Sequence, residues 1–303
     1  MKRFLGIFVA TLLSAIPLAA QAEVNIFACE PEWAALAEEI GGNKVETFSA
    51  THANQDPHYI RARPSLIAKM RKANVLLCSG AGLEAGWLPL LLQKAGGEVQ
   101  PGAVGHLMAT DVVPVLEKPV TIDRSQGDVH PQGNPHVHLN PHNVLLVAKE
   151  LTTRLGKIDA GNAYFYISRY QDFFARWQKA ITNWEAKAFA LKGKPVVVHH
   201  KSFVYLLDWL GIQEVAALEP KPGISPTTSH LESLLRQMKN KPASLVLRTP
   251  YDPDDASQWL SKKTGIPVVV LPYTVGGDAR SGNLFSLFGR TISLMTGIYD
   301  DQH

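Results

Sequence analysis

The sequence contains little cysteine and little excess charge. Only two of the 303 residues are cysteine, which excludes a disulfide-dense scaffold and a cysteine-rich zinc framework. The 30 lysines and arginines nearly balance the 27 acidic residues, so the net charge is only +3 and no basic face is indicated. We therefore expect no nucleic-acid partner. After the first 20 residues the chain has no uncharged apolar run long enough to span a membrane, which predicts a soluble mature protein.

The N-terminus has the features of a secretory signal peptide. Met1-Lys2-Arg3 provides a short positive start, and the stretch from Phe4 to Ala20 carries no charge. Ala20-Gln21-Ala22 then fits a small-x-small cleavage site. We expect residues 1–22 to be removed during export to a bacterial periplasm, and a retained membrane anchor is the alternative. A lipid anchor is not expected, because no cysteine stands at the processing site.

The rest of the chain has the size and pattern of two α/β units. With 303 residues and 46% hydrophobic side chains, it can fill about two globular cores. Short apolar runs alternate with amphipathic stretches in both halves, which predicts parallel sheets with crossover helices. The runs expected as strands are 24–29, 74–78, 112–113, 195–198, 243–247 and 267–271, and the expected helices are 32–40, 64–72, 142–156, 203–210, 254–264 and 284–296.

A single long helix is predicted between the two halves. No proline occurs from Asp159 to Leu191, and apolar or aromatic residues recur there every three or four positions, which marks one helix face. A helix of about 33 residues would span roughly 50 Å. We therefore predict an α/β fold with two lobes, each with a parallel β-sheet flanked by helices. The expected divisions are residues 23–157 and 193–303 for the lobes and 158–192 for a rigid backbone helix, with a ligand in the interlobe cleft.

The two cysteines each follow a run that is expected to be a parallel strand. If those strands are neighbours, Cys29 and Cys78 lie close enough for a disulfide, which an oxidising periplasm would preserve. Two buried free thiols are the alternative, because cysteine is often a small core residue.

Histidine is the residue type that points to chemistry. The 11 histidines include three groups that follow strand-like runs or lie in turns: His58, the pair His136 and His138, and the adjacent pair His199 and His200. Imidazole is a common ligand of borderline transition metals. The groups are far apart in the sequence, so they form one site only if the fold brings loop ends together. Adjacent residues on a strand point opposite ways, so we expect only one of the last pair to serve.

Several motifs together resemble a known family. They are Asp56-Pro57-His58-Tyr59 with Arg63-Pro64-Ser65, the stretch from Pro135 to Pro141, the stretch from Val198 to Leu207, the stretch from Leu218 to Pro226, and Gly82 to Leu88. In combination they resemble the periplasmic zinc/manganese-binding receptors of bacterial metal ABC transporters over essentially the whole mature chain. The resemblance implies one metal ion between two α/β lobes that are joined by a single backbone helix.

The resemblance also implies the metal ligands. His58, His136 and His200 fall on three ligand positions of the family, and His138 is expected only to line the site. The fourth position carries a carboxylate in the family. Thr274 stands there in register, so we assign the role to Asp278, four residues later, on a Gly-Gly loop that can adopt unusual backbone angles. Water or the loop histidine His130 is the alternative fourth ligand, and Glu219 is a weaker candidate.

The ligand set favours zinc over manganese. Three neutral imidazoles and one oxygen suit tetrahedral Zn²⁺, whereas Mn²⁺ prefers oxygen donors. We expect a monomeric receptor, not an enzyme, that captures Zn²⁺ and delivers it to the membrane permease of an ABC transporter. A zinc hydrolase using the same three histidines is the alternative, although no H-E-x-x-H motif is present. A metal-sequestering or adhesion protein without a transporter is a further alternative.

Overall fold

Two four-stranded parallel sheets form the two lobes. The computed structural model describes residues 23–121, 127 and 129–300, and the expected signal peptide lies outside this range. The first sheet has the order β2-β1-β3-β4 and the second the order β6-β5-β7-β8. The strands are β1 (Val24–Ala28), β2 (Val45–Ser49), β3 (Val75–Cys78), β4 (His106–Met108), β5 (Pro195–Val198), β6 (Gln213–Ala217), β7 (Leu245–Arg248) and β8 (Val268–Val270). The predicted two-lobe α/β fold is confirmed.

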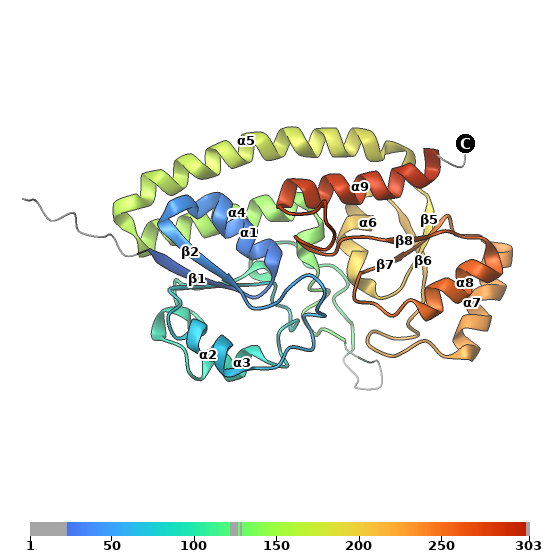
Figure 1. Cartoon of the computed structure of the whole chain (residues 1–303), viewed down its shortest axis with the longest axis horizontal. Coiled ribbons are helices and arrows are strands. Elements are labelled where there is room, and N and C mark those ends of the chain that lie inside the picture. The colour runs from blue at the N-terminus through green and yellow to red at the C-terminus, as the bar shows by residue number, and fades with distance from the viewer. Residues whose placement is uncertain (1–22, 122–126, 128, 301–303) are drawn as a thin grey trace, which may run out of the picture.

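Helices cover both sheets and connect the lobes (Figure 1). They are α1 (Pro31–Gly41), α2 (Pro64–Met70), α3 (Leu88–Leu92), α4 (Pro141–Ile158), α5 (Ala163–Ala188), α6 (Val204–Leu210), α7 (Thr228–Asn240), α8 (Asp255–Thr264) and α9 (Leu284–Asp300). The helices α6 and α8 end where the sequence predicts. Gly211 and Gly265 follow them with left-handed backbone angles, which glycine adopts without strain. Among the described residues no helix is long and apolar enough to cross a membrane.

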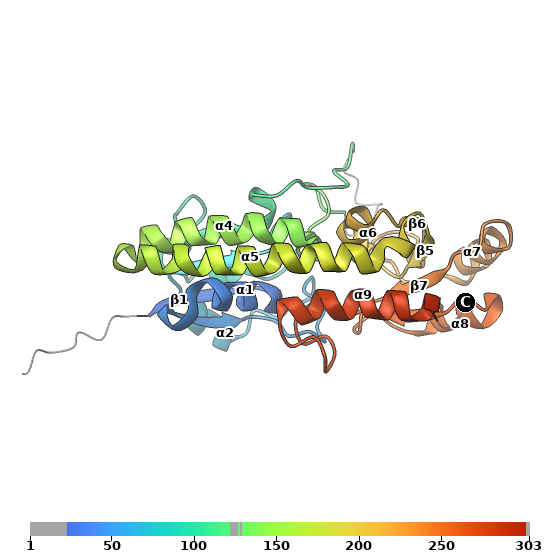
Figure 2. The same cartoon turned by 90° about the horizontal axis from the view of Figure 1, so that it is seen from above.

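The long helix α5 runs beside α4 and α9 along both lobes (Figures 1 and 2). Short 3₁₀ turns, Ala160–Asn162 and Phe189–Leu191, continue it at both ends. The residues at helical spacing that it buries are Tyr166, Phe173, Trp177, Ile181, Trp184 and Ala188. The predicted apolar stripe is therefore the face that packs into the core, where Trp177 and Trp184 contact the Phe288 ring of α9.

The strand expected at residues 112–113 is wrong. The fourth strand of the first sheet is β4, which pairs with β3, and a 3₁₀ turn at Ala109–Asp111 follows it. Only the central residue of β4, Leu107, is fully buried, so this short edge strand gives a weak hydrophobic signal. The edge strands β2 and β6 also carry exposed polar residues and were not predicted.

A disulfide joins Cys29 to Cys78 in the first lobe. Both cysteines are fully buried at the carboxyl ends of the neighbouring strands β1 and β3, and their Cα atoms are 4.8 Å apart. Of the two alternatives, the structure therefore favours the disulfide over two free thiols.

Candidate metal centre

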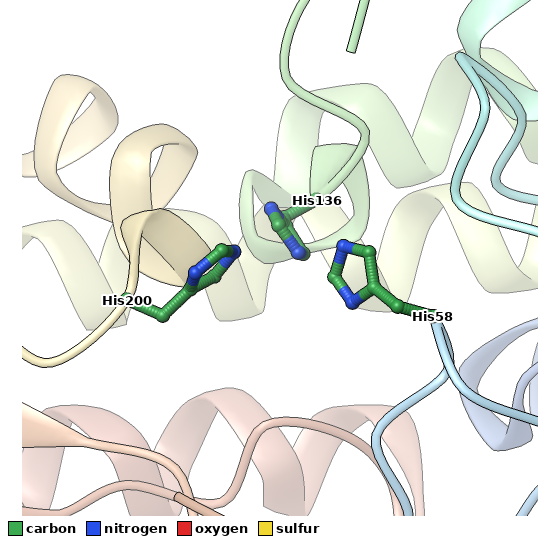
Figure 3. A group of neighbouring side chains, drawn as sticks. All are labelled: His58, His136 and His200. Atoms are coloured by element: carbon green, nitrogen blue, oxygen red, sulfur yellow. The ribbon is translucent and has the colours of Figure 1, made fainter. Parts of the chain in front are cut away.

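Three histidines from distant parts of the chain meet between the lobes. His58 lies in the loop between β2 and α2, His136 lies just before α4, and His200 follows β5. One ring nitrogen of each lies within 4.8 Å of the others, and the ring centroids are 5.5–5.6 Å apart. Figure 3 shows the three rings facing a common centre. The structure thus brings together the three histidines that the sequence analysis singled out.

Hydrogen bonds between loops hold these histidines in place. The indole of Trp87 donates to the carbonyl oxygen of Pro57 at 3.0 Å, which fixes the loop that carries His58. The Asn134 side chain donates to the carbonyl oxygen of Lys201 at 2.9 Å, and the Tyr205 hydroxyl donates to the carbonyl oxygen of Asn134 at 2.7 Å. The segment before His136 is therefore tied to the segment after His200, so two ligand-bearing loops are positioned against each other.

Each of the three histidines has an oxygen partner on its Nδ1 atom. The distances are 2.6 Å from His58 to Asp56, 2.8 Å from His136 to Asn134 and 2.7 Å from His200 to Glu219. These oxygens accept a hydrogen bond, so Nδ1 carries the proton and Nε2 keeps its lone pair for a metal ion. Such outer partners orient metal-binding histidines and raise their basicity.

The Nε2 atom of His136 has no hydrogen-bond partner within the described part of the chain. This nitrogen is fully buried, and the whole residue is 1% exposed. Buried polar atoms in folded proteins nearly always have a partner. A metal ion at the centre of the three rings would satisfy this nitrogen, so the orphaned atom is direct support for a metal centre.

The environment shifts the pKa values of His136 and His200 in opposite directions. Burial, together with the neighbouring His200 and His58, holds the pKa of His136 well below its usual value. Burial also acts to lower the pKa of His200, but its hydrogen bond to Glu219 and nearby carboxylates raise it overall. Burial opposes ionisation of Asp56, yet its bond to His58 keeps its pKa low. Two outer carboxylates, Asp56 and Glu219, can therefore offset the charge of a divalent cation.

A family model described as "Zinc-uptake complex component A periplasmic" (ZnuA) matches residues 26–295. The chain belongs to this family. The metal ABC transporter substrate-binding lipoprotein SloC of Streptococcus mutans is 23% identical over 276 residues, which cover 89% of this chain and 86% of SloC. The manganese ABC transporter substrate-binding lipoprotein PsaA of Streptococcus pneumoniae is 24% identical over 286 residues, which cover 89% of each protein.

Solved structures show the same fold as this ZnuA-family chain. The crystal structure of ZnuA matches with a TM-score of 0.73 at 19% identity, covering 90% of this chain and 99% of that one. The structure of FpvC from Pseudomonas aeruginosa in complex with Mn²⁺ matches with a TM-score of 0.78 at 20% identity, covering 93% and 100%. The predicted family is confirmed: this protein is a metal ABC transporter substrate-binding protein.

In this ZnuA-family protein, Asp278 lies outside the histidine group. Its carboxylate pairs with the Arg290 guanidinium at 2.6 Å and accepts a hydrogen bond from the Arg280 backbone at 2.8 Å. The Gly276-Gly277 turn folds the loop back on itself. The backbone N–H of Gly276 donates to the carbonyl oxygen of Ser281, and that of Asp278 donates to the Ser281 hydroxyl. The predicted fourth ligand is therefore engaged elsewhere. Thr274, which stands in the family's register, is buried and donates to Glu32.

The other histidines near the site have different surroundings. His130 lies beside the group, with its Nε2 3.2 Å from the Nε2 of His58. His138 is buried between Glu32, at 3.2 Å, and the carbonyl oxygen of Tyr273, at 2.9 Å, so it is not one of the clustered ligands. His199 lines a separate cavity in the second lobe.

Sequence reasoning missed most of the outer partners. Glu219 was considered only as a weak ligand, and Asp56 and Asn134 were given no role. A readable signal exists for the last two, since each stands two residues before its histidine and each also accepts that histidine's backbone N–H. Glu219 has no such local signal, because strand pairing in the second sheet brings it to His200.

Proposed function

We propose that this receptor binds Zn²⁺ as its transported ion and delivers it to an ABC permease. The observation that carries the proposal is the donor set: three imidazole nitrogens face one point, and no carboxylate oxygen belongs to the group within the described residues. Nitrogen-rich sites suit zinc, whereas manganese and magnesium sites are rich in oxygen. The family model is described by zinc uptake, whereas related proteins are named for manganese and for iron, so the donor set carries the choice of zinc.

We further propose that His130 completes the coordination in place of Asp278. Tetrahedral zinc with bonds of about 2.0–2.1 Å to nitrogen holds its ligand nitrogens about 3.3 Å apart. The Nε2 atoms of His58 and His130 already have a comparable separation of 3.2 Å, but His130 lies outside the group of three histidines whose ligand atoms are all within 4.8 Å, so it has to move toward His136 and His200 to join them. Water in the fourth position is the alternative, and it predicts that His130→Ala leaves zinc affinity nearly unchanged.

The space around the histidines supports a receptor and not a hydrolase. The cavity beside His58 and His200 has a volume of about 100 Å³, which corresponds to about three water molecules. Pockets that bind organic substrates are usually about 300–1,000 Å³. The site therefore accommodates an ion and a few waters, and we propose that the protein has no catalytic activity. Export to the periplasm through residues 1–22, and a monomeric state, complete the proposal.

Metal analysis of untagged protein tests the choice of metal. Protein produced in medium with equal zinc and manganese should retain zinc at about one ion per chain. Competitive titration of metal-free protein should show at least tenfold tighter binding of Zn²⁺ than of Mn²⁺. Equal affinity, or tighter binding of Mn²⁺, would contradict the proposal. Hydrolysis of a standard ester or peptide substrate that requires His200 would favour the enzyme instead.

A further inference from the structure

Two small cavities adjoin the three clustered histidines. One has a volume of about 100 Å³, and its lining includes His58 and His200. The other has a volume of about 80 Å³, and its lining includes His136 and His200. Each holds about three water molecules, so the structure offers two routes between solvent and the metal centre.

The two cavities differ in charge. The carboxylates of Asp56, Glu219 and Asp252 line the first cavity, and its described lining contains no lysine or arginine. The second is lined by Glu117 and Lys201, whose side chains form an ion pair with each other. We call the first the acidic cavity and the second the paired-charge cavity. A cleft lined by charge of one sign attracts a dication, whereas paired charges largely cancel.

The ligands that solvent reaches lie on the acidic cavity. The side chains of His58 and His200, which line it, are 11% and 12% exposed. The whole His136 residue is only 1% exposed, and its Nε2 atom is buried without a partner in the described parts of the chain. An ion that comes from solvent through the acidic cavity therefore meets His58 and His200 first and His136 last.

Two of the three carboxylates are held by the ligands themselves. Asp56 accepts a hydrogen bond from Nδ1 of His58 at 2.6 Å, and Glu219 accepts one from Nδ1 of His200 at 2.7 Å. Glu219 also accepts the backbone N–H of Gly223 at 2.9 Å. These two side chains orient the histidines, so they are already engaged when a hydrated ion arrives.

Asp252 is the third carboxylate, and other contacts fix it. One of its oxygens accepts the backbone N–H of Thr249 at 2.7 Å, directly after β7. Burial lowers the pKa of His200, and the charge of Asp252 is among those that oppose burial, which places this carboxylate near the ligand. Asp252 does not belong to the group of ligand atoms within the described residues. It is therefore available to attract an ion without binding it permanently.

We propose that the metal ion enters the receptor through the acidic cavity and that Asp252 draws it in. The hydrated ion exchanges its waters first for His58 and His200 and then for His136, and Asp252 is not a ligand of the bound ion. The proposal rests on ion capture at the three histidines. It does not depend on which divalent metal is carried, because attraction by a carboxylate acts on charge.

Stopped-flow mixing of the metal-free mature chain with Zn²⁺, and separately with Mn²⁺, measures the association rate. A fluorescent chelator that reports the free ion follows the reaction. Asp252→Asn should slow association about three- to tenfold with both metals at low ionic strength. The difference should shrink at an ionic strength of about 0.5 M, because salt screens the attraction.

Matched variants separate attraction by Asp252 from other effects. Asp252→Glu keeps the charge and should associate within about twofold of the wild-type rate. Asp254→Asn removes the same charge from an exposed residue outside the lining and should leave the rate unchanged. Asp252→Ser also removes the charge but keeps an oxygen for the Thr249 N–H, and it should slow association as Asp252→Asn does. The test therefore does not depend on the folding of one variant.

The outcomes distinguish this route from the identity of the metal. Slower association of Asp252→Asn with both metals supports the route even if Mn²⁺ binds more tightly than Zn²⁺, a result that would contradict only the choice of zinc. An unchanged rate with both metals in Asp252→Asn and Asp252→Ser would overturn the route. Equal slowing in Asp254→Asn would also overturn it, because the effect would then come from overall charge and not from the acidic cavity.

Discussion

Acid should release the metal ion in a way that depends on Glu219. Metal and proton compete for each histidine, so affinity falls with pH only below the pKa that the histidine has in the metal-free protein. The pKa of His136 is well below its usual value, so this ligand stays neutral in mild acid. The pKa of His200 is raised through Glu219, so His200 takes up a proton first as the pH falls.

The magnitude follows from this order. A histidine with a pKa of about 6.5 is about one quarter protonated at pH 7 and almost fully protonated at pH 5. Because the pKa of His200 lies above that value, its protonation alone should weaken zinc binding at least about 25-fold between pH 7 and pH 5, or about 1.9 kcal/mol. Protonation of His136 should contribute little to the change in zinc affinity between pH 7 and pH 5. The total loss of affinity should therefore be smaller than three histidines with ordinary pKa values would produce.

Glu219→Gln separates this mechanism from general acid sensitivity. Loss of the outer carboxylate should weaken zinc binding about 10–100-fold at pH 7.5. It should also lower the pKa of His200, so the further loss between pH 7 and pH 5 becomes smaller. Glu232→Gln removes the same charge from an exposed position on α7 and should change neither quantity.

Competition with a chelator of known zinc affinity, repeated at half-unit pH intervals, measures both effects. Nitrogen chemical shifts of the His200 ring in metal-free protein report its protonation directly. A flat affinity profile in the wild type would refute the reasoning. So would a Glu219→Gln profile as steep as that of the wild type.

Three further outcomes are expected. Replacing His58, His136 or His200 by Ala should weaken zinc binding at least tenfold, or about 1.4 kcal/mol, whereas His199→Ala should have a much smaller effect. Isothermal titration with zinc measures both. Unchanged zinc binding in His200→Ala would show that the wrong histidine of the pair His199 and His200 was assigned. Burial raises the pKa of Glu84 from 4.5 to about 7, so the folded protein holds a proton that the unfolded chain releases between those values, and stability falls as pH rises through that window. Glu84→Gln should therefore increase the free energy of unfolding by about 3 kcal/mol at pH 8 and by little at pH 4.5. Urea denaturation at the two pH values measures this difference. Equal effects at both pH values would count against the explanation. The helix α5 is continuous, contains no proline and packs against α4 and α9, so we expect it to resist bending. The radius of gyration measured by small-angle scattering should therefore stay the same when zinc is added. A clear decrease would mean that the lobes rotate.

Local signals in the sequence were sufficient for much of this protein. The apolar stripe of α5 follows from helical periodicity, and β5 coincides with the predicted residues 195–198 because a short apolar run precedes a polar turn. The three clustered histidines were identified through their motifs, since each lies in a short stretch whose pattern resembles the family. These features depend on residues that are close together in the chain.

Only the tertiary structure decided the features that depend on pairing between distant segments. The neighbouring positions of β1 and β3 bring Cys29 to Cys78, and the pairing of β5 with β6 brings Glu219 to His200. The ion pair between Asp278 and Arg290 on α9 was not foreseen, because a contact between a loop and a helix leaves no trace in local spacing.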